Sequence, residues 1–286
     1  VEPLANYNVL VLDQRFNGNS SVSLINTNVT RNGDFRDANV TALVFDLNTK
    51  ENTFALEGDY KYSFVNEYGN EENKQGYNTF LNFAKTSQKF RFGLGAKYVS
   101  QDYDPNDLGI NFQTHYHAYN GNISFRTLEP TKVFNNINST ISYYSEFDNI
   151  TSKIQANSLS ANINFTTVQN DSFNFYLNTR PTEIYNFYEP RSIDDSKYFI
   201  EPKFIGGQFV FSSNYNRKFA IDAIPSYRKY DQENRERYGV LISPKYRFNN
   251  HLSSTLDFDY LRQNNNLGWV DFDDERNVAM SRARMA

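Results

Sequence analysis

The chain of 286 residues contains no cysteine, only one tryptophan and no long apolar run. The missing cysteine excludes a disulfide framework, a thiolate metal site and a catalytic cysteine. No apolar stretch approaches the roughly 18 residues of a membrane-spanning helix. The first residues, Val1, Glu2 and Pro3, form neither an initiator methionine nor a signal peptide. We therefore expect a mature chain or a fragment of a longer one.

The chain also lacks a large excess of charge of one sign. The 33 acidic and 29 basic residues leave a formal net charge of −4, and the basic residues are scattered along the chain. Nucleic-acid binding leaves a clustered basic footprint. The sequence therefore predicts no nucleic-acid partner.

Aromatic residues, by contrast, are abundant. They make up 16% of the chain, which excludes ordinary disorder. Apolar content is low: the 39% hydrophobic content, with the 21 Tyr removed and the 13 Gly added, becomes roughly 36%, against a typical value of about 45–50%. Many aromatic and few aliphatic residues favour a surface that alternates apolar with polar side chains over a thick buried core.

Apolar side chains recur with period two, which places them on one face of a β-strand. The clearest segment is 53–64, where Phe54, Leu56, Tyr60 and Phe64 alternate with polar or small residues. The same pattern recurs in 90–98, 238–248 and 255–260. One face of each strand suits lipid and the other suits water.

About 15 such segments occur, most of roughly 10 residues or more, which is longer than the usual strand of a soluble protein. Their connections alternate between short and long, as in outer-membrane barrels. The expected short turns are 17–19, 48–52, 86–89, 128–132, 169–171, 216–218 and 249–251. The expected long connections are 67–76, 101–113, 178–205, 231–237 and 263–276.

The fold prediction is an all-β, antiparallel transmembrane β-barrel that occupies residues 1–286 as one domain. Bacterial barrels usually have an even number of strands and no open edge. We therefore expect a barrel of 16 or more strands, with terminal strands missing. Seven tyrosines are expected at the strand ends beside the long loops, as an aromatic girdle at one membrane interface: Tyr60, Tyr62, Tyr77, Tyr98, Tyr227, Tyr238 and Tyr260.

Charged side chains alternate with the apolar ones and are predicted to face the lumen. They can pair across strands and stiffen the wall, or they can line an aqueous path. Across the turn at Asn250, Lys245 should face Thr255, with Asp257 on the diagonal. The lumen-lining candidates are Glu57, Asp59, Lys61, Arg91, Lys97, Asp222, Arg228, Lys245, Arg247, Asp257 and Asp259.

Three groups are weak candidates for metal ligands. His115 and His117 would project from one face of a strand, as a metal pair requires, but no third ligand is visible nearby. Asp102 and Asp104 alternate in a long loop that lacks the glycine and glutamate of a calcium loop. The stretch Asp271, Asp273, Asp274 and Glu275 could bridge calcium or could be a solvated loop. We expect no cofactor.

No catalytic constellation is readable. The chain has three histidines, and His251 falls on a short turn at the end of the barrel opposite the long loops. We therefore predict that the chain is not an enzyme.

Four segments resemble an uncharacterised family of outer-membrane barrel proteins of the Bacteroidota type, which is named only as a domain of unknown function. They are 6–14 (NYNVLVLDQ), 37–41 (DANVT), 243–249 (SPKYRFN) and 267–270 (LGWV). The resemblance covers essentially the whole chain. It implies a barrel in the bacterial outer membrane, preceded by a secreted domain similar to family-9 carbohydrate-binding modules and continued beyond the equivalent of Ala286. It implies no catalytic residues.

Two functions remain open at this stage. The first is a porin-like or uptake channel for a small polar solute such as a saccharide. The second is a non-conducting membrane anchor, or a structural subunit of an outer-membrane assembly, that displays a glycan-binding domain. The expected partners are outer-membrane lipid, other outer-membrane or periplasmic subunits, and a saccharide ligand.

Overall fold

The computed structural model describes residues 3–69, 72–107, 115–187, 189, 197–272 and 278–285. Within these ranges the chain is all-β and antiparallel, and it contains no helix, as the period-two pattern predicts. None of the residues searched forms a helix with the length and hydropathy to cross a membrane.

The chain separates into two compact units. Unit 1 comprises residues 1–121 and 145–153, and unit 2 comprises residues 122–144 and 154–286. Strands β7 and β8 contribute to both units.

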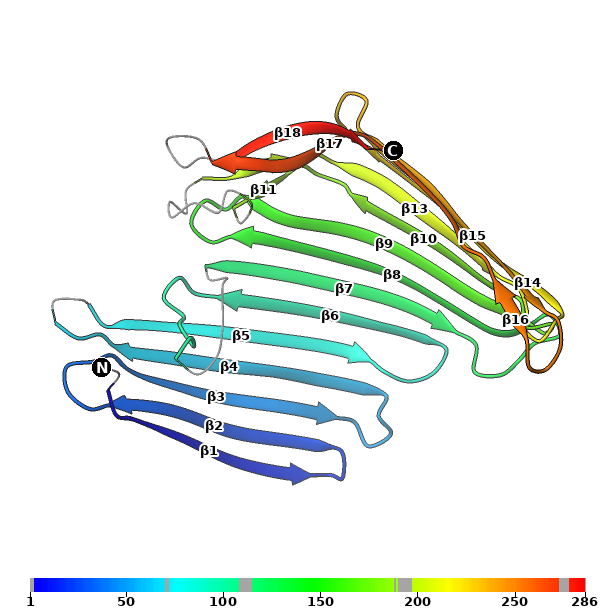
Figure 1. Cartoon of the computed structure of the whole chain (residues 1–286). Helices are drawn as coiled ribbons and strands as arrows, with labels where there is room; N and C mark the ends of the chain where they lie inside the picture. The colour runs from blue at the N-terminus through cyan, green and yellow to red at the C-terminus, as the bar shows by residue number, and fades with distance from the viewer. Residues whose placement is uncertain are drawn as a thin grey trace. The chain divides into compact units, whose positions relative to one another are not determined.

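Unit 1 is a meander in which each strand pairs with the next one in sequence (Figure 1). The recorded pairs from β1 to β6 are all antiparallel and in continuous register. Its strands are β1 (Ala5–Phe16), β2 (Ser20–Arg31), β3 (Asp37–Asn48), β4 (Phe54–Asn66), β5 (Lys74–Lys85), β6 (Phe90–Val99) and the first half of β7 (Tyr116–Arg126).

Unit 2 follows the same plan, with one small separate sheet. Its main strands are β8 (Phe134–Asp148), β9 (Ile154–Thr167), β10 (Ser172–Arg180), β13 (Phe204–Ser212), β14 (Phe219–Tyr230), β15 (Glu236–Arg247), β17 (Phe258–Phe272) and β18 (Val278–Met285), in that order. The short strand β16 (Ser253–Thr255) pairs with β15, and β11 (Ile184–Asn186) pairs with β12 (Phe199–Glu201).

The predicted strand count is confirmed for the described part of the chain. Apart from the three-residue strands β11, β12 and β16, fifteen strands of 8 to 15 residues are present. The turns 17–19, 86–89 and 169–171 also fall between strands as predicted.

Four predicted long connections are wrong in their bounds: 67–76 overlaps β5 from Lys74 and 231–237 overlaps β15 from Glu236, and the other two differ more. Residues 178–180 belong to β10 and 204–205 to β13, and the β11/β12 ribbon lies between them. Likewise β17 continues to Phe272, so most of the predicted connection 263–276 is strand. The strands are longer than predicted because pairing with a neighbouring strand continues at these residues. Asn178 lies opposite Gly206, and Gln263 lies opposite Arg237. The local polar sequence, on which the loop prediction rested, does not show such pairing.

Strand β4 of unit 1 has two chemically different faces. Leu24, Leu43 and Tyr60 form one cross-strand row, whereas the adjacent row contains Asp59 opposite Val44. We call the face with Leu24, Leu43 and Tyr60 the aromatic face. The face with Glu57, Asp59 and Lys61 is the charged face.

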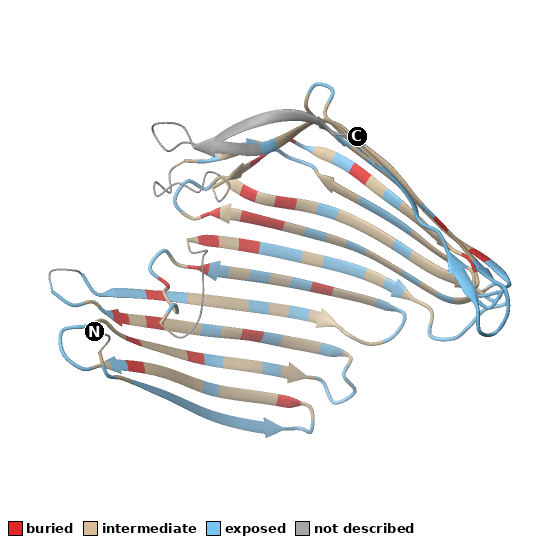
Figure 2. Cartoon of the chain, viewed as in Figure 1, coloured by how far each residue is buried: buried red, intermediate tan, exposed pale blue. Residues whose placement is uncertain are grey.

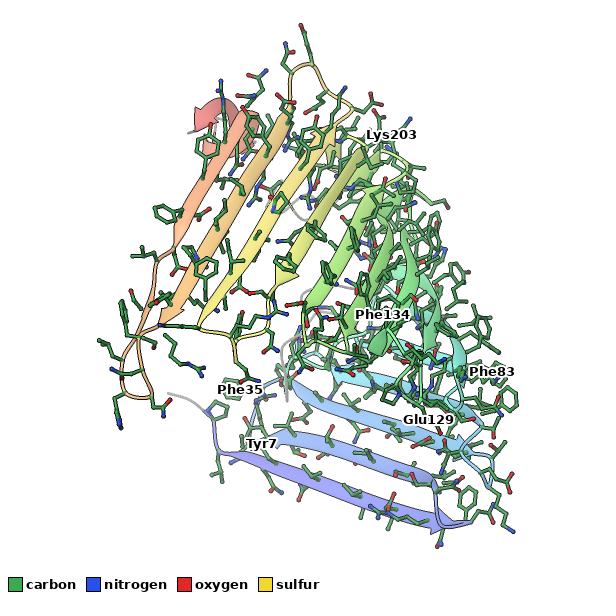
Figure 3. All side chains as sticks on the ribbon, turned by 90° about the vertical axis from the view of Figure 1, so that its right-hand side faces the viewer. Tyr7, Phe35, Phe83, Glu129, Phe134 and Lys203 are labelled. Carbon is green, nitrogen blue, oxygen red and sulfur yellow. The ribbon has the colours of Figure 1, made fainter. Side chains whose placement is uncertain are left out.

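Few side chains are deeply buried, and those that are lie scattered along the strands (Figure 2). The only buried hydrophobic cluster identified among the described residues consists of Val29, Ala38 and Val65, with Ala5 packed against it. Large apolar side chains instead stand away from the sheet; Phe83, for example, projects outward and is 41% exposed (Figure 3). The sheets of each unit are therefore not held by a conventional interior.

Candidate functional site

The charged face of unit 1 begins on β4, where three predicted lumen-lining residues follow one another at every second position. Lys61 Nζ lies 3.0 Å from Asp59 Oδ2. Glu57 accepts a 3.0 Å hydrogen bond from Asn82 on β5. These contacts fit the pairing that stiffens a wall, because each charge meets a partner on its own face.

Two further candidates, Arg91 and Lys97, lie on the same face of β6. Register places Lys97 opposite Phe80, and its ammonium lies 5.4 Å from the ring of Tyr116. Arg91 donates to the backbone carbonyl of Gln88 at 3.2 Å. Both remain near the sheet surface.

In unit 2 the structure brings together Asp222 and Lys245. Asp222 on β14 lies opposite Ser243 and Lys245 lies opposite Ala220, so both share one face, which we call the charged face of unit 2. Lys245 Nζ is 2.8 Å from Asp222 Oδ2. Tyr215 also donates to this carboxylate at 2.7 Å, and its ring lies 3.8 Å from the ammonium. The sequence pattern did not single out Tyr215, because it lies in a turn.

The predicted contact across the turn at Asn250 is only partly as expected. Lys245 does lie opposite Thr255. Asp257, however, accepts a hydrogen bond from Ser243 at 2.5 Å, while Lys245 pairs with Asp222.

The three remaining candidates lie near the same face of unit 2. Arg247 donates to the carbonyl of Tyr215 at 3.0 Å. Asp259 lies opposite Leu241. Arg228 stacks on Phe204, with 4.5 Å between its guanidinium carbon and the ring centroid. A lumen position for all these residues stays a prediction.

A feature that the sequence pattern missed is a loop folded back onto the charged face of unit 1. We call residues 100–107, which follow β6, the latch loop. The backbone amide of Asp104 donates to Ser63 Oγ on β4 at 3.0 Å. Tyr103 is only 5% exposed, and its backbone covers Gly76: a Cβ at Gly76 would lie 2.1 Å from the Tyr103 nitrogen. Only glycine fits under the loop at this point.

Arginine side chains hold the end of the latch loop. Arg36 Nη2 lies 2.8 Å from Asp104 and 2.7 Å from Asp107, and its Nη1 lies 3.1 Å from Glu67. Arg31 adds a 2.7 Å contact to Asp107. Arg31 at the end of β2 and Arg36 in the β2–β3 connection thus bind three carboxylates on two other loops.

Electrostatic interactions favour the position of the latch loop on the charged face of unit 1. Burial opposes ionisation of Asp104, but a hydrogen bond from the Asn106 amide and the Arg36 guanidinium outweigh burial and lower its pKa. Burial, reinforced by the nearby Asp59 carboxylate, raises the pKa of Tyr103. At neutral pH the latch loop therefore contributes the neutral Tyr103 ring and the ionised Asp104 carboxylate.

The candidate metal ligands are engaged in other contacts. His115 Nε2 lies 3.4 Å from the buried Asp148, and His117 Nδ1 lies 2.7 Å from Asn149 Oδ1. Asp104 pairs with Arg36, whereas Asp102 is exposed. Among the residues searched, no group of three His, Asp or Glu side chains is arranged to hold a metal.

Most of the acidic stretch near the C-terminus lies outside the described residues. Asp271 lies in β17 and not in a loop, because it pairs with Ala279 of β18. Asp273, Asp274 and Glu275 lie outside the described residues.

The aromatic face of unit 1 carries a continuous band of rings. Tyr60 stacks on Tyr77 at 6.2 Å, Tyr77 on Tyr98 at 5.4 Å, and Tyr98 on His117 at 6.5 Å. Phe147 completes the row at 5.2 Å from His117. The band contains three of the seven tyrosines expected in a girdle, although Tyr60 lies in the middle of β4 and not at a strand end. Its position in a membrane stays a prediction.

Comparison with known proteins places the chain in a family without assigning an activity. No curated protein matches it. One family model, described as a domain of unknown function (DUF5916), matches residues 1–286. Because the match covers the whole sequence, the chain belongs to this DUF5916 family.

Proposed function

We propose that the chain forms a transmembrane β-barrel of the bacterial outer membrane and passes a small polar solute, such as a saccharide, through its lumen. The observation that carries the proposal is the exposed aromatic face. Leu43, Tyr60, Leu81 and Leu94 are 46–60% exposed and share one face of unit 1. A soluble protein rarely leaves so large an apolar surface open to water.

Strand length supports the same proposal. A tilted strand needs about 9–11 residues to cross the hydrocarbon layer, and β1–β6 have 10 to 13 residues each. The long strands pair in chain order, as in an up-and-down barrel, with only the short strands β11, β12 and β16 outside this order. Closure would also pair the outer edge of β1, whose Val9 and Leu12 are more than half exposed.

The charged faces suit a water-filled lumen. Asp59 with Lys61 and Asp222 with Lys245 place both charge signs on the face opposite the aromatic side chains. Unit 2 adds an amide cluster on its charged face: Asn174 donates to Asn162 and Asn164. A wall of mixed charges and amides favours polar solutes over ions of a single sign.

The latch loop supports a restriction of that path. In the proposed barrel the charged face of unit 1 lines the lumen, so the latch loop would occupy lumen space. The predicted long connection 178–205 is a poorer candidate for this role, because it contains strand residues that pair within the sheet.

Single-channel conductance in a planar bilayer tests the proposal, with the unmodified protein and Arg36→Gln compared. Steady conductance of the unmodified protein supports passage. If the unmodified protein does not conduct but Arg36→Gln does, the result supports passage controlled by the latch loop. If neither protein conducts, the result contradicts passage and favours the alternative, a non-conducting anchor or assembly subunit that displays a glycan-binding domain.

A further inference from the structure

Unit 2 contains a hollow of about 200 Å³ on its charged face. Strands β10, β13, β14 and β15 form it, and Gly206 and Gly207 lie at its base. Its polar lining comprises Tyr176, Asn178, Gln208, Ser226, Arg228 and Arg237.

Strand register explains why this part of the face is hollow. One cross-strand row runs Asn178, Gly206, Arg228, Arg237. Gly206 interrupts the row with a missing side chain, and a Cβ there would lie 3.1 Å from the Arg228 Cβ. The adjacent row runs Tyr176, Gln208 and Ser226, and continues to Gly239. Gly206 in one row and Gly239 in the other thus leave space between long polar side chains.

The charges that border the hollow are unbalanced. Arg228 and Arg237 lie directly opposite each other on β14 and β15, an arrangement that costs free energy when the charges are alike. Within the described part of the chain, neither arginine has an ion-pair partner. The neighbouring Arg180 differs, because Glu201 lies 2.7 Å from it.

The surrounding groups define what could offset this charge. Two guanidinium groups provide parallel N–H donors that match a carboxylate. Phe204 holds Arg228 by stacking, which leaves the guanidinium edge available. Asn178 and Gln208 carry both donors and acceptors, and Tyr176, 37% exposed, presents a ring. Amides and an aromatic ring are groups that bind sugar hydroxyls and apolar sugar faces.

We propose that this hollow is a binding site for a small acidic saccharide, in which Arg228 and Arg237 bind the carboxylate and Asn178, Gln208 and Tyr176 contact the ring. The inference rests on the proposed function, since it names the solute class of the proposed channel. Binding can nevertheless be measured without conductance, so the two proposals fail separately.

Isothermal titration of the purified full-length protein with glucuronate, and with glucose as the neutral match, tests the site. We expect glucuronate to bind and glucose to bind at least about tenfold more weakly, because a charged hydrogen bond contributes about that factor. Arg228→Gln and Arg237→Gln should each weaken glucuronate binding by a similar factor. Arg91→Gln, which removes an arginine from the charged face of unit 1, should not change it.

A second variant tests whether the open space of the hollow is needed when both arginine charges remain. Gly206→Val fills the base of the hollow but keeps both arginines, and valine suits a strand. With an unchanged circular dichroism spectrum, loss of glucuronate binding in Gly206→Val would support the site. No glucuronate binding by the unmodified protein, equal binding of glucose, or equal loss in Arg91→Gln would overturn the proposal.

Discussion

Arg36 and Asp107 are separated by 71 residues in the sequence, yet the Arg36 Nε–H donates to Asp107 Oδ2 at 2.8 Å. The same guanidinium also contacts Asp104 and Glu67, so one side chain joins three loop segments of unit 1. This arrangement makes the latch loop an ordered part of the charged face.

Arg36→Gln should release the latch loop. The Asp107 and Glu67 side chains are 9% and 8% exposed, and without Arg36 each keeps one basic partner, Arg31 for Asp107 and Lys74 for Glu67. We expect a local destabilisation of about 1–3 kcal/mol, at the lower end because Arg36 itself is 30% exposed. Hydrogen exchange at the amides of Tyr103 and Asp104 should accelerate.

Arg15→Gln is the matched control, because the Arg15 side chain is 87% exposed and pairs only loosely with Asp13. It should leave exchange in the latch loop unchanged. Unaltered protection of Tyr103 in Arg36→Gln would show that the arginine does not hold the loop.

Gly76→Ala should displace the latch loop without breaking β5. The added methyl group would lie 2.1–2.3 Å from the backbone of Asp102 and Tyr103, which cannot move aside as a flexible side chain can. We expect greater solvent exposure of Tyr103, measured by ultraviolet difference absorption. Gly121→Ala is the control, since its methyl group would meet the movable Leu94 side chain at 3.3 Å.

Acid should loosen the latch loop. The pKa of Asp104 is lowered in the folded chain, so its ionised form contributes stability above the unfolded value of about 3.9. That contribution is lost as the pH falls through the lowered pKa. Protease cleavage in 101–107 should stay slow from neutral pH to about pH 4 and accelerate below it.

Asp104→Asn removes the titrating group and provides the comparison. Its cleavage should be faster at neutral pH and should depend less on pH between about 4 and 2. An identical acid response in both proteins would assign the effect to another group.

Sequence pattern predicted the strands and their faces, but not the folded-back loop. Alternation places Asp59 and Lys61 on one face because strand geometry alone determines this. The contacts of Arg36 with Asp104 and Asp107 depend instead on where three loops meet, and no local pattern encodes that. One signal was present: Gly76 interrupts the alternation of β5, and a strand glycine often marks close approach of another backbone.

The hollow in unit 2 was equally hidden from the sequence. Arg228 was predicted to share a face with other charged residues, but the row that joins it to Asn178, Gly206 and Arg237 requires the register of four strands. The connection predicted at 178–205 also placed Asn178 outside the sheet. Register depends on cross-strand packing, which a single sequence shows only near short turns such as that before Thr255.

Leu81→Arg distinguishes a membrane barrel from a soluble sheet. Leu81 is 49% exposed on the aromatic face, so in water the substitution should change stability by no more than about 0.5 kcal/mol. If this face contacts lipid near the bilayer centre, the arginine should cost about 2–4 kcal/mol. A folding titration in lipid vesicles measures the difference directly. Asp59→Asn on the charged face is the control and should be mild, because asparagine keeps the size of the side chain and the lost ion pair is with Lys61, whose side chain is 35% exposed. Equal effects of the two substitutions, or a small effect of Leu81→Arg in lipid, would contradict the assignment of the aromatic face to the bilayer.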